Sequence, residues 1–360
     1  MPQATFEIRK ELTEAIELFG DGHTDAALEK FSVASSIRPG SKPIGTQDPA
    51  TLARMCEAMP QNLTARLALA DTLSVDEAQP KYVSIVRQLR ALKGFERAPE
   101  AGQIDVPSLN NLHWHSIDLG REWIEGLRKT AKVLAHEMLM AEWPDLTGKS
   151  VLDIGAFGGW FSFEAERRGA SQVTAMEYYS WVLDFPKVRK WVSERLASGQ
   201  IANAYDPPDD CFDFENQPGR LAFDLTRKAL NSDVTPWLAK FEDVELPPHD
   251  VTLLLGVLYH NENPYQMLEQ VAGATRERLI IETHAASCPH ALTDPTWHFF
   301  GAGEVRGDGS TFWAPSEQGL VDMLKRVGFQ RIEVLYGWDL VAPLPQKSSV
   351  QHRMWVHAHK

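Results

Sequence analysis

One short stretch of the sequence constrains the fold more than any other. Residues 151–160 read VLDIGAFGGW, an apolar run that ends in a glycine-rich turn, and a helical pattern follows. A second apolar run, VTAMEYY at residues 173–179, contains an acid at Glu177. Strand, tight turn, helix and strand in this order predict a βαβ unit whose backbone can approach a ligand closely at the turn. The chain is therefore expected to be an α/β protein built on a Rossmann-like sheet.

The glycine spacing separates two classes of cofactor. A dinucleotide site usually has the pattern G-x-G-x-x-G, which lets a pyrophosphate sit on the helix N-terminus. Here the turn reads GAFGG, with Phe157 where a second glycine would stand, and Asp153 would repel an incoming phosphate. S-adenosylmethionine (SAM) fits better, because it has no phosphate and carries a cationic sulfonium and an ammonium group. We expect Asp153 to hold the ammonium, directly or through water, and Glu177 to bind the ribose hydroxyls.

The pattern D-x-G-x-x-x-G followed by a second acid resembles the signature of class I SAM-dependent methyltransferases. An ordinary βαβ turn with an incidental acid is the alternative. Aromatic rings at Trp160 and Tyr259 are candidates to face the sulfonium, where a ring stabilises positive charge by roughly 1 kcal/mol, or else they belong to the core. The resemblance implies that the cofactor is bound by Asp153, Gly155, Phe157, Gly159, Trp160, Glu177, Tyr178, Glu242, Asp243, Val244, Gly256 and Tyr259, with residues 242–244 beside the adenine.

Composition limits the class of partner. The 360 residues include 36 Lys and Arg against 49 Asp and Glu, a net charge of −13. Nucleic acid is a poor partner for such a chain, because its binding depends on neutralising phosphates with Lys and Arg. The three cysteines, Cys56, Cys211 and Cys288, are scattered, which fits a reducing compartment and offers no cysteine-based metal cluster. No long apolar run or leader peptide is evident, so we expect a cytoplasmic protein.

The first part of the chain reads as helical. Residues 1–98 contain no convincing strand, and residues 8–19 and 24–37 have the offsets of a tetratricopeptide-like helix pair. Further helices are expected at 50–59, 63–73 and 79–92. This N-terminal region is expected to mediate homo-oligomerisation or to cover the active site, and a plain helical appendage is the alternative. Residues 99–145 would form a connector and a flanking helix, Glu122–Glu142, stopped by Pro144.

The SAM-binding domain is expected to span residues 146–360, with an insertion at 178–219. The insertion is rich in aromatic residues and prolines and has no strand pattern. It predicts a lid or a substrate wall, or else a surface excursion with a small core of its own. After it, the pattern predicts a mostly parallel sheet with one reversed edge strand, from strands at 234–238, 251–258, 278–282, 331–336 and 350–358 and helices at 220–230, from Pro264 onward and at 316–327.

A wider resemblance appears in the second half of the chain. The runs LLGVLYHNENP (254–264), LIIETH (279–284) and FWAPSEQGLVDMLKRVGF (312–329) resemble the family that contains the tRNA wobble-uridine carboxymethyltransferase. They look still more like its uncharacterised bacterial relatives. The resemblance covers residues 110–360, and it implies a class I methyltransferase.

One departure from that family bears on the substrate. The tRNA branch carries a Trp-Arg-Lys-Gly-Pro-Phe run whose Lys helps to bind a carboxylated cofactor, whereas this chain has no Lys or Arg between Ala98 and Gly120. Tyr259 and Arg353 do match positions that contact the carboxylate in that branch. We therefore expect ordinary SAM and a small-molecule acceptor, methylated on an O or N atom in secondary metabolism. A tRNA-modifying transferase and a non-catalytic scaffold with a degenerate methyltransferase fold are the alternatives.

Three histidines are the candidate catalytic residues. Methyl transfer needs alignment of the nucleophile and, for a hydroxyl, a proton acceptor, and imidazole titrates near neutral pH. His260 follows the fourth strand at the carboxyl edge of the sheet and is the first candidate, His284 after the fifth strand is the second, and His115 is the third. A hydrogen-bonded structural histidine is the alternative for each. No helix-spaced ligand pair is present, so no metal is expected.

Overall fold

The computed structural model describes residues 63–71, 73–92, 114–119, 123–127, 130–141, 143–286, 294–301, 309–336 and 350–360, with single residues at positions 14, 18, 23, 26 and 53. Contacts divide the chain into two units, which are described separately. Residues 1–95, 129–143 and 336–347 form the first, and residues 96–128, 144–335 and 348–360 form the second. The helices predicted at 8–19, 24–37 and 50–59 lie outside the described residues apart from those single positions. The domain boundaries at 98 and 145 stay predictions.

The described part of the first unit is helical. It contains α4 (Leu63–Ala70), α5 (Val75–Leu92) and α7 (Ala131–Met140). Helices α4 and α5 confirm the helices that periodicity predicts at 63–73 and 79–92. Leu67 on α4 and Leu134 on α7 are both buried. The Tyr82 hydroxyl donates to the Asp71 carboxylate at 2.8 Å, and Lys132 Nζ lies 3.2 Å from the same group. By its contacts, the helix predicted to flank the sheet belongs with the N-terminal helices.

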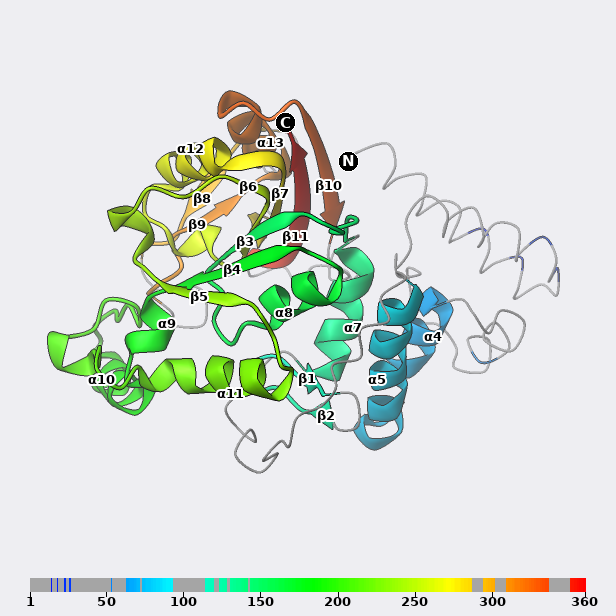
Figure 1. The fold of residues 1–360 in the computed structure, drawn as a ribbon, viewed down its shortest axis with the longest axis horizontal. Coiled ribbons are helices and arrows are strands. Elements are labelled where there is room, and N and C mark those ends of the chain that lie inside the picture. Colours follow the sequence, from blue (N-terminus) through cyan, green and yellow to red (C-terminus); the bar gives the residue numbers. More distant parts are fainter. Residues whose placement is uncertain are drawn as a thin grey trace. The chain divides into compact units, whose positions relative to one another are not determined.

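The second unit is built on a seven-stranded sheet (Figure 1). Its strands are β3 (Ser150–Ile154), β4 (Gln172–Glu177), β5 (Thr235–Leu238), β6 (His249–Leu255), β7 (Thr275–Ala286), β10 (Arg331–Tyr336) and β11 (Val350–His359). Their order across the sheet is β10-β11-β7-β6-β3-β4-β5. Strands β3 to β7 pair in parallel, and β11 is antiparallel to β7. The predicted α/β class with a mostly parallel sheet is confirmed.

The reversed strand differs from the prediction in its position. It does not form the edge, because β11 lies between β7 and β10. Met354, Trp355, Val356 and Ala358 are all buried, so both faces of β11 are covered. A strand buried on both faces belongs in the interior of a sheet, and β10 takes the edge.

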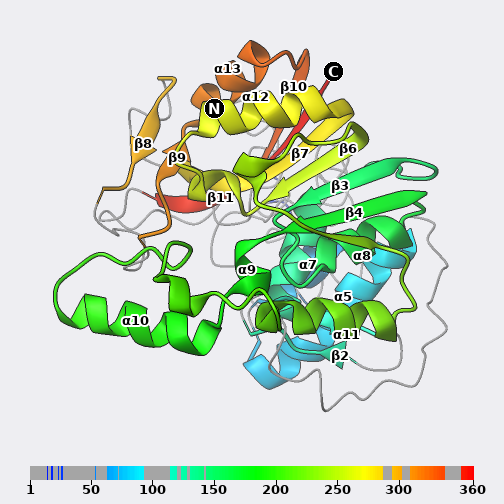
Figure 2. The ribbon, with the colours of Figure 1, turned by 60° about the vertical axis from the view of Figure 1, so that its left-hand side comes forward.

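Helices cover both faces of this sheet (Figure 2). On one side lie α12 (Pro264–Ala274) and α13 (Glu317–Arg326), and on the other lie α8 (Trp160–Arg167) and α11 (Leu221–Ala229). Pro264 opens α12 as predicted, and the Ser316 hydroxyl caps α13 by accepting from Gly319 N at 3.0 Å. The core on the α12 and α13 side contains Leu152, Ile154, Leu254, Leu268, Val271, Ile281, Leu320, Leu324 and Val356.

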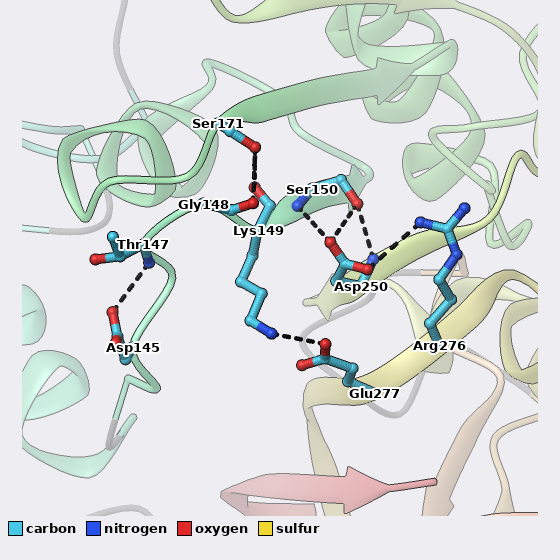
Figure 3. A network of polar contacts seen from close by, with 9 residues as sticks. All are labelled: Asp145, Thr147, Gly148, Lys149, Ser150, Ser171, Asp250, Arg276 and Glu277. Atoms are coloured by element: carbon cyan, nitrogen blue, oxygen red, sulfur yellow. Dashed lines mark hydrogen bonds and ion pairs between the residues drawn. The ribbon is translucent and has the colours of Figure 1, made fainter.

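Polar side chains join the strands at the amino-terminal edge of the sheet (Figure 3). The Asp250 carboxylate accepts from the backbone N and the Oγ of Ser150, both at 2.8 Å. Arg276 Nη1 lies 3.4 Å from Asp250, and Lys149 Nζ lies 2.6 Å from Glu277 Oε1. These contacts hold β3, β6 and β7 in register at the edge opposite to the ends where the predicted site residues lie.

The predicted helix over residues 122–142 is wrong in its first part. A short antiparallel pair, β1 (Ile117–Asp118) and β2 (Trp123–Ile124), precedes α7. Gly126 N donates to Ser116 Oγ at 2.9 Å, and a Cβ at this glycine would stand 2.4 Å from Ser116 N. The close approach of two backbone segments therefore breaks the helical pattern at Gly126.

The strand predicted at residues 251–258 also ends earlier than expected. The apolar run at 251–258 reads as one strand, but β6 stops at Leu255 and Gly256 adopts a φ of +78°. The chain then turns into η4 (Leu258–His260). In contrast, β7 continues four residues beyond Glu282 to Ala286, where β11 pairs along it.

The insertion forms a small substructure. It contains α9 (Tyr179–Val182), α10 (Phe185–Ala197), η1 (Asp209–Cys211) and η2 (Pro218–Arg220). Leu183, Val188 and Cys211 are buried within it, as the alternative of a small core of its own predicts. The remaining described elements are η3 (Phe241–Asp243) and the antiparallel pair β8 (Trp297–Phe299) and β9 (Trp313–Pro315). No helix among the described residues combines the length and apolar character needed to cross a membrane.

Candidate cofactor and catalytic site

The sheet has a topological switch point between β3 and β6. From β3 the chain adds β4 and β5 on one side, and then returns to add β6 and β7 on the other. Loops leaving the carboxyl ends of β3 and β6 therefore diverge, and ligands of open α/β sheets bind in that crevice. A Cβ at Gly155 would stand 2.4 Å from Val257 Cγ2, so the two loops meet at their bases. Glycine is required there for space as well as for its φ of +76°.

The turn after β3 is held in a strained conformation. Gly155 N and Ala156 N both donate to Met176 O, at 2.9 and 3.0 Å, which ties the turn to β4. Phe157 has a φ of +50°, a conformation that costs a non-glycine residue about 1–3 kcal/mol. The Trp181 indole N–H donates to Phe157 O at 2.7 Å and holds this conformation. Contacts from Met176 on β4 and Trp181 on α9 therefore fix the turn that is predicted to approach the cofactor.

Asp153 is buried at the end of β3. Its side chain is 1% exposed, and it accepts a hydrogen bond from Ser162 Oγ at 2.5 Å. Burial, together with the nearby charge of Glu177, raises the pKa of Asp153 to about 7, although the hydrogen bond from Ser162 acts in the opposite direction. Ser162 was not predicted from the sequence. The available signal was a polar residue on the buried face of a helix that otherwise carries Trp160 and Phe163 there.

Glu177 is buried at the end of β4. Its carboxylate accepts from the backbone N–H groups of Phe157, Tyr178 and Ser180, at 3.0, 2.8 and 3.2 Å. Burial raises the pKa of this carboxyl, although the three N–H groups act in the opposite direction. The Phe157 N–H connects Glu177 to the glycine turn. Glu177 is thereby bonded to the turn that follows Asp153, and its charge is near enough to raise the pKa of Asp153.

The two carboxyls fit a cationic ligand. Among the described residues, no Lys, Arg or His lies within ion-pair distance of Asp153 or Glu177. Burying a carboxylate without a compensating charge is costly, and here the cost appears as a raised pKa for each. A ligand that brings positive charge to this turn would relieve the cost. SAM has such groups in its ammonium and sulfonium, and its ribose hydroxyls match an oriented carboxylate.

Aromatic rings surround the turn. The Phe157 ring lies 5.6 Å from that of Trp114 and 6.2 Å from that of Phe185. Tyr178, directly after the buried Glu177, packs against Phe214 at 5.9 Å, and Phe214 is 53% exposed. The sequence did not single out Phe185 or Phe214 individually, because their approach to the turn depends on how the insertion folds.

The His115 ring packs against the first residues of α8. Its ring stacks on Trp160 at 5.9 Å and meets Phe161 edge-on at 5.2 Å. Trp160 itself is 4% exposed. His115 thus contacts the beginning of α8, whereas His260 and His284 both contact Tyr259.

His260 and His284 both pack on Tyr259. The ring centroids lie 4.2 Å and 4.3 Å from that of Tyr259. The Arg353 guanidinium stands over the Tyr259 ring at 4.8 Å, and it donates to the hydroxyl at 3.3 Å. His260 after β6, His284 on β7 and Arg353 on β11 therefore form one cluster around Tyr259. The prediction that His284 follows its strand is wrong, because β7 continues past it to Ala286, but both histidines reach the same tyrosine.

The tautomer of His260 follows from its contact with the chain. Nδ1 lies 2.7 Å from the carbonyl oxygen of Ser310. A carbonyl only accepts, so Nδ1 carries the proton and the lone pair of the neutral ring is on Nε2. Tyr205 of the insertion meets the ring edge-on at 5.0 Å. This is the protonation pattern that a general base requires.

His284 is engaged differently. Its Nε2 lies 3.3 Å from Arg353 Nη1, which can only donate, so the lone pair at Nε2 accepts from the guanidinium. Arg353 is in turn paired with both carboxylate oxygens of Glu282, with Nη2 at 2.5 Å. Gly256 lies beside the group, since a Cβ there would stand 3.6 Å from Arg353 Nη2. The structure therefore distinguishes the two histidines: a backbone carbonyl accepts from Nδ1 of His260, whereas a guanidinium donates to Nε2 of His284.

The residues predicted to contact adenine follow β5. Glu242 and Asp243 are exposed on η3, and Val244 follows them. Asn261, next to His260, donates to Glu242 Oε1 at 3.3 Å, and Gln270 donates to Val244 O at 2.6 Å. This segment is thus placed beside the loop that follows β6. For the part of the chain that is described, no group of three or more potential metal ligands is found.

Comparison with known proteins supports the class of fold and cofactor. No family model matches the chain. It is 25% identical over 228 residues to the tRNA U34 carboxymethyltransferase of Alteromonas mediterranea, covering 62% of this chain and 55% of that protein. The chain thus spans about half the length of this curated relative. The similarity confirms the predicted resemblance to class I SAM-dependent methyltransferases and to this tRNA-modifying family.

Solved structures with similar folds include two methyltransferases and the N-terminal domain of EvdMO1. A SAM-dependent methyltransferase from Mesorhizobium loti has 17% identity and a TM-score of 0.35, over 61% of this chain and 94% of that one. The 1,6-didemethyltoxoflavin-N1-methyltransferase of Burkholderia thailandensis has 13% identity and a TM-score of 0.36, over 59% and 72%. The N-terminal domain of EvdMO1 has 15% identity and a TM-score of 0.41, over 77% and 95%. Similarities this low do not bear on activity or substrate.

Proposed function

We propose that this protein is a SAM-dependent methyltransferase acting on an O or N atom of a small molecule. The observation that carries the proposal is the pair of buried carboxyls, Asp153 and Glu177, on either side of the glycine turn at the switch point. Their pKa values are raised, and no cationic side chain among the described residues compensates them. In this proposal Asp153 binds the ammonium of SAM and Glu177 binds the ribose hydroxyls. The proposal includes a cytoplasmic location and a role in secondary metabolism.

Ordinary SAM suits the site better than a carboxylated cofactor. Arg353 is the cation that a cofactor carboxylate would need, and it is already paired with both oxygens of Glu282. Releasing the guanidinium would leave the Glu282 carboxylate, which is 3% exposed, without its partner. The pairing therefore favours transfer of a simple methyl group.

His260 is the proposed general base. Its Nε2 lone pair is fixed by the Ser310 carbonyl at Nδ1, and it follows the strand next to the cofactor turn. A hydroxyl acceptor would lose its proton to Nε2 as the methyl group is transferred. For an amine acceptor that is already neutral, His260 would serve only to position the nucleophile.

A tRNA-modifying transferase is the second candidate. The similarity to tRNA U34 carboxymethyltransferase favours it, and so does the match of Tyr259 and Arg353 to that family. The net charge of −13 opposes it, because tRNA binding depends on Lys and Arg contacts to phosphates. Copurification of tRNA with the full chain, lost at high salt, would favour this candidate. A non-catalytic scaffold is the third, and it predicts that SAM does not bind.

Calorimetry with SAM tests the proposal. We expect binding in the micromolar range, and we expect Glu177→Ala to weaken it by about 1–3 kcal/mol through the loss of charged hydrogen bonds. Glu269→Ala, at an exposed acid on α12, is the matched control and should leave the affinity unchanged. Absence of heat at high micromolar SAM would favour the scaffold. Equal affinity of Glu177→Ala and the parent protein would refute the ribose assignment.

A further inference from the structure

The segment that fixes the His260 tautomer is itself held by the insertion. Ser310, whose carbonyl accepts from His260 Nδ1, is 2% exposed. Directly before it, Gly309 N donates to Ala202 O of the insertion at 3.1 Å. Two residues after Ser310, Phe312 N donates to Tyr259 O at 2.8 Å. The segment 309–312 is therefore anchored on one side by the insertion and on the other by η4, which carries His260.

Gly309 is required by the approach of the insertion. A Cβ there would stand 2.5 Å from Ala202 O and 2.6 Å from Ile201 Cγ2. The first of these atoms belongs to the backbone, so it cannot move aside as a flexible side chain can. The constraint is steric, since Gly309 is not among the glycines with a positive φ. Any side chain at this position must push segment 309–312 away from the insertion.

The insertion also touches the histidine directly. Tyr205 meets the His260 ring edge-on at 5.0 Å, and it packs on Tyr179 of α9 at 5.9 Å. In Figure 2, α9 and α10 of the insertion and β9 all lie beyond the left-hand end of the sheet. Two contacts from one substructure thus converge on His260, one on its ring and one on the segment that holds its Nδ1.

We propose that the insertion positions His260 through Gly309, so that the Nδ1–H tautomer is maintained and the lone pair stays on Nε2. Gly309 and Ala202 are positioning residues in this proposal and do not touch the acceptor. The insertion then has a role in the chemistry beyond that of a lid or wall. The proposal deepens the proposed function, in which His260 is the base, but the tautomer can be measured without any acceptor or SAM.

The test is the ring-nitrogen NMR spectrum of the full chain labelled with ¹⁵N-histidine, recorded at about pH 8.5, well above the ordinary titration range of histidine. The His260 signals are assigned by their loss in His260→Ala. In the parent protein we expect Nδ1 to be the protonated nitrogen. In Gly309→Ala we expect the Nε2–H form, which predominates for the neutral histidine side chain in water, to become at least as abundant as the Nδ1–H form.

Gly273→Ala is the matched control, because a Cβ at this helical glycine meets no atom within 4 Å. We expect its His260 spectrum to equal that of the parent. Ile201→Ala, at an exposed residue of the insertion, is a milder second variant that should shift the tautomers in the same direction if Gly309→Ala does not fold. An unchanged Nδ1–H tautomer in the folded Gly309→Ala protein, or in Ile201→Ala in its place, overturns the proposal.

The two proposals fail in different ways. If SAM gives no heat, the proposed function fails while the tautomer result still decides the positioning role. If Gly309→Ala changes the tautomer but methyl transfer keeps its rate, the positioning role stands and the assignment of His260 as base is refuted.

Discussion

The affinity for SAM should depend on pH through Asp153. Burial and the charge of Glu177 raise the pKa of this carboxyl from 3.8 to about 7. Keeping Asp153 ionised in the ligand-free protein therefore costs roughly 4 kcal/mol relative to water. A bound ammonium favours the ionised form, so binding must drive off the proton wherever Asp153 is protonated. Below its pKa, each unit of pH should weaken binding about tenfold.

The expected profile has a maximum. At about pH 5 the affinity should be roughly 100-fold lower than at pH 7.5, because about one molecule in 100 has Asp153 ionised. Above about pH 8 the α-amino group of the ligand itself loses its proton, and the affinity should fall again. The same ionisation lowers the stability of the ligand-free fold. The raised pKa means that stability contributed by the protonated form is present at low pH and is lost as the pH rises toward 7.

Calorimetry in buffers of different ionisation enthalpy provides the measurement. At about pH 6 we expect close to 0.9 proton released for each SAM bound. Asp153→Asn should remove this release and flatten the acid side of the profile, with weaker binding at neutral pH. S-adenosylhomocysteine keeps the ammonium but lacks the sulfonium, so it should show the same proton release. Binding that is independent of pH between about 5 and 7, with no proton released, would refute the assignment of the ammonium to Asp153.

Two further predictions concern the base and the turn. With an acceptor hydroxyl, His260→Ala should lower the rate about 100-fold or more and leave SAM affinity nearly unchanged, whereas His284→Ala should have a smaller effect on the rate; equal losses in single-turnover assays would contradict the distinction. Gly155→Ala should destabilise the protein by about 2–4 kcal/mol, because it adds the clash with the loop after β6 to the strain of a positive φ. Gly148 also has a positive φ, +73°, but a Cβ there would meet no atom within 4 Å. In urea unfolding, Gly148→Ala should therefore lose only the backbone strain energy, about 1–2 kcal/mol.

Local patterns were sufficient for the elements of the sheet. The predicted strand at residues 331–336 is observed with the same bounds, and α12 begins at Pro264 as expected. Each of these signals lies within a few residues, as an apolar run or a proline that fits the first turn of a helix. Where a predicted element was wrong, its residues instead contact another segment of the chain or form a turn. The helix predicted from Glu122 is broken at Gly126, which Ser116 approaches too closely for a side chain.

The sequence by itself determined the two acids and the glycine turn of the proposed cofactor site. Two of these residues, Asp153 and Glu177, lie at the ends of β3 and β4, and Gly155 lies in the turn that follows β3. Local chain geometry brings such residues together. The class of cofactor followed from the absence of a second glycine and from the charge at Asp153.

Only the tertiary structure decided what the histidines can do. From the sequence, His260 and His284 were both expected to follow strands, and nothing local distinguishes them, although His284 lies within β7. The difference comes from Ser310, which fixes the proton on Nδ1 of His260, and from Arg353, which donates to Nε2 of His284. Both partners are distant in the sequence, 50 and 69 residues away. Hydrogen-bond direction and burial depend on which distant segments meet, and a single sequence carries that information only through the completed fold.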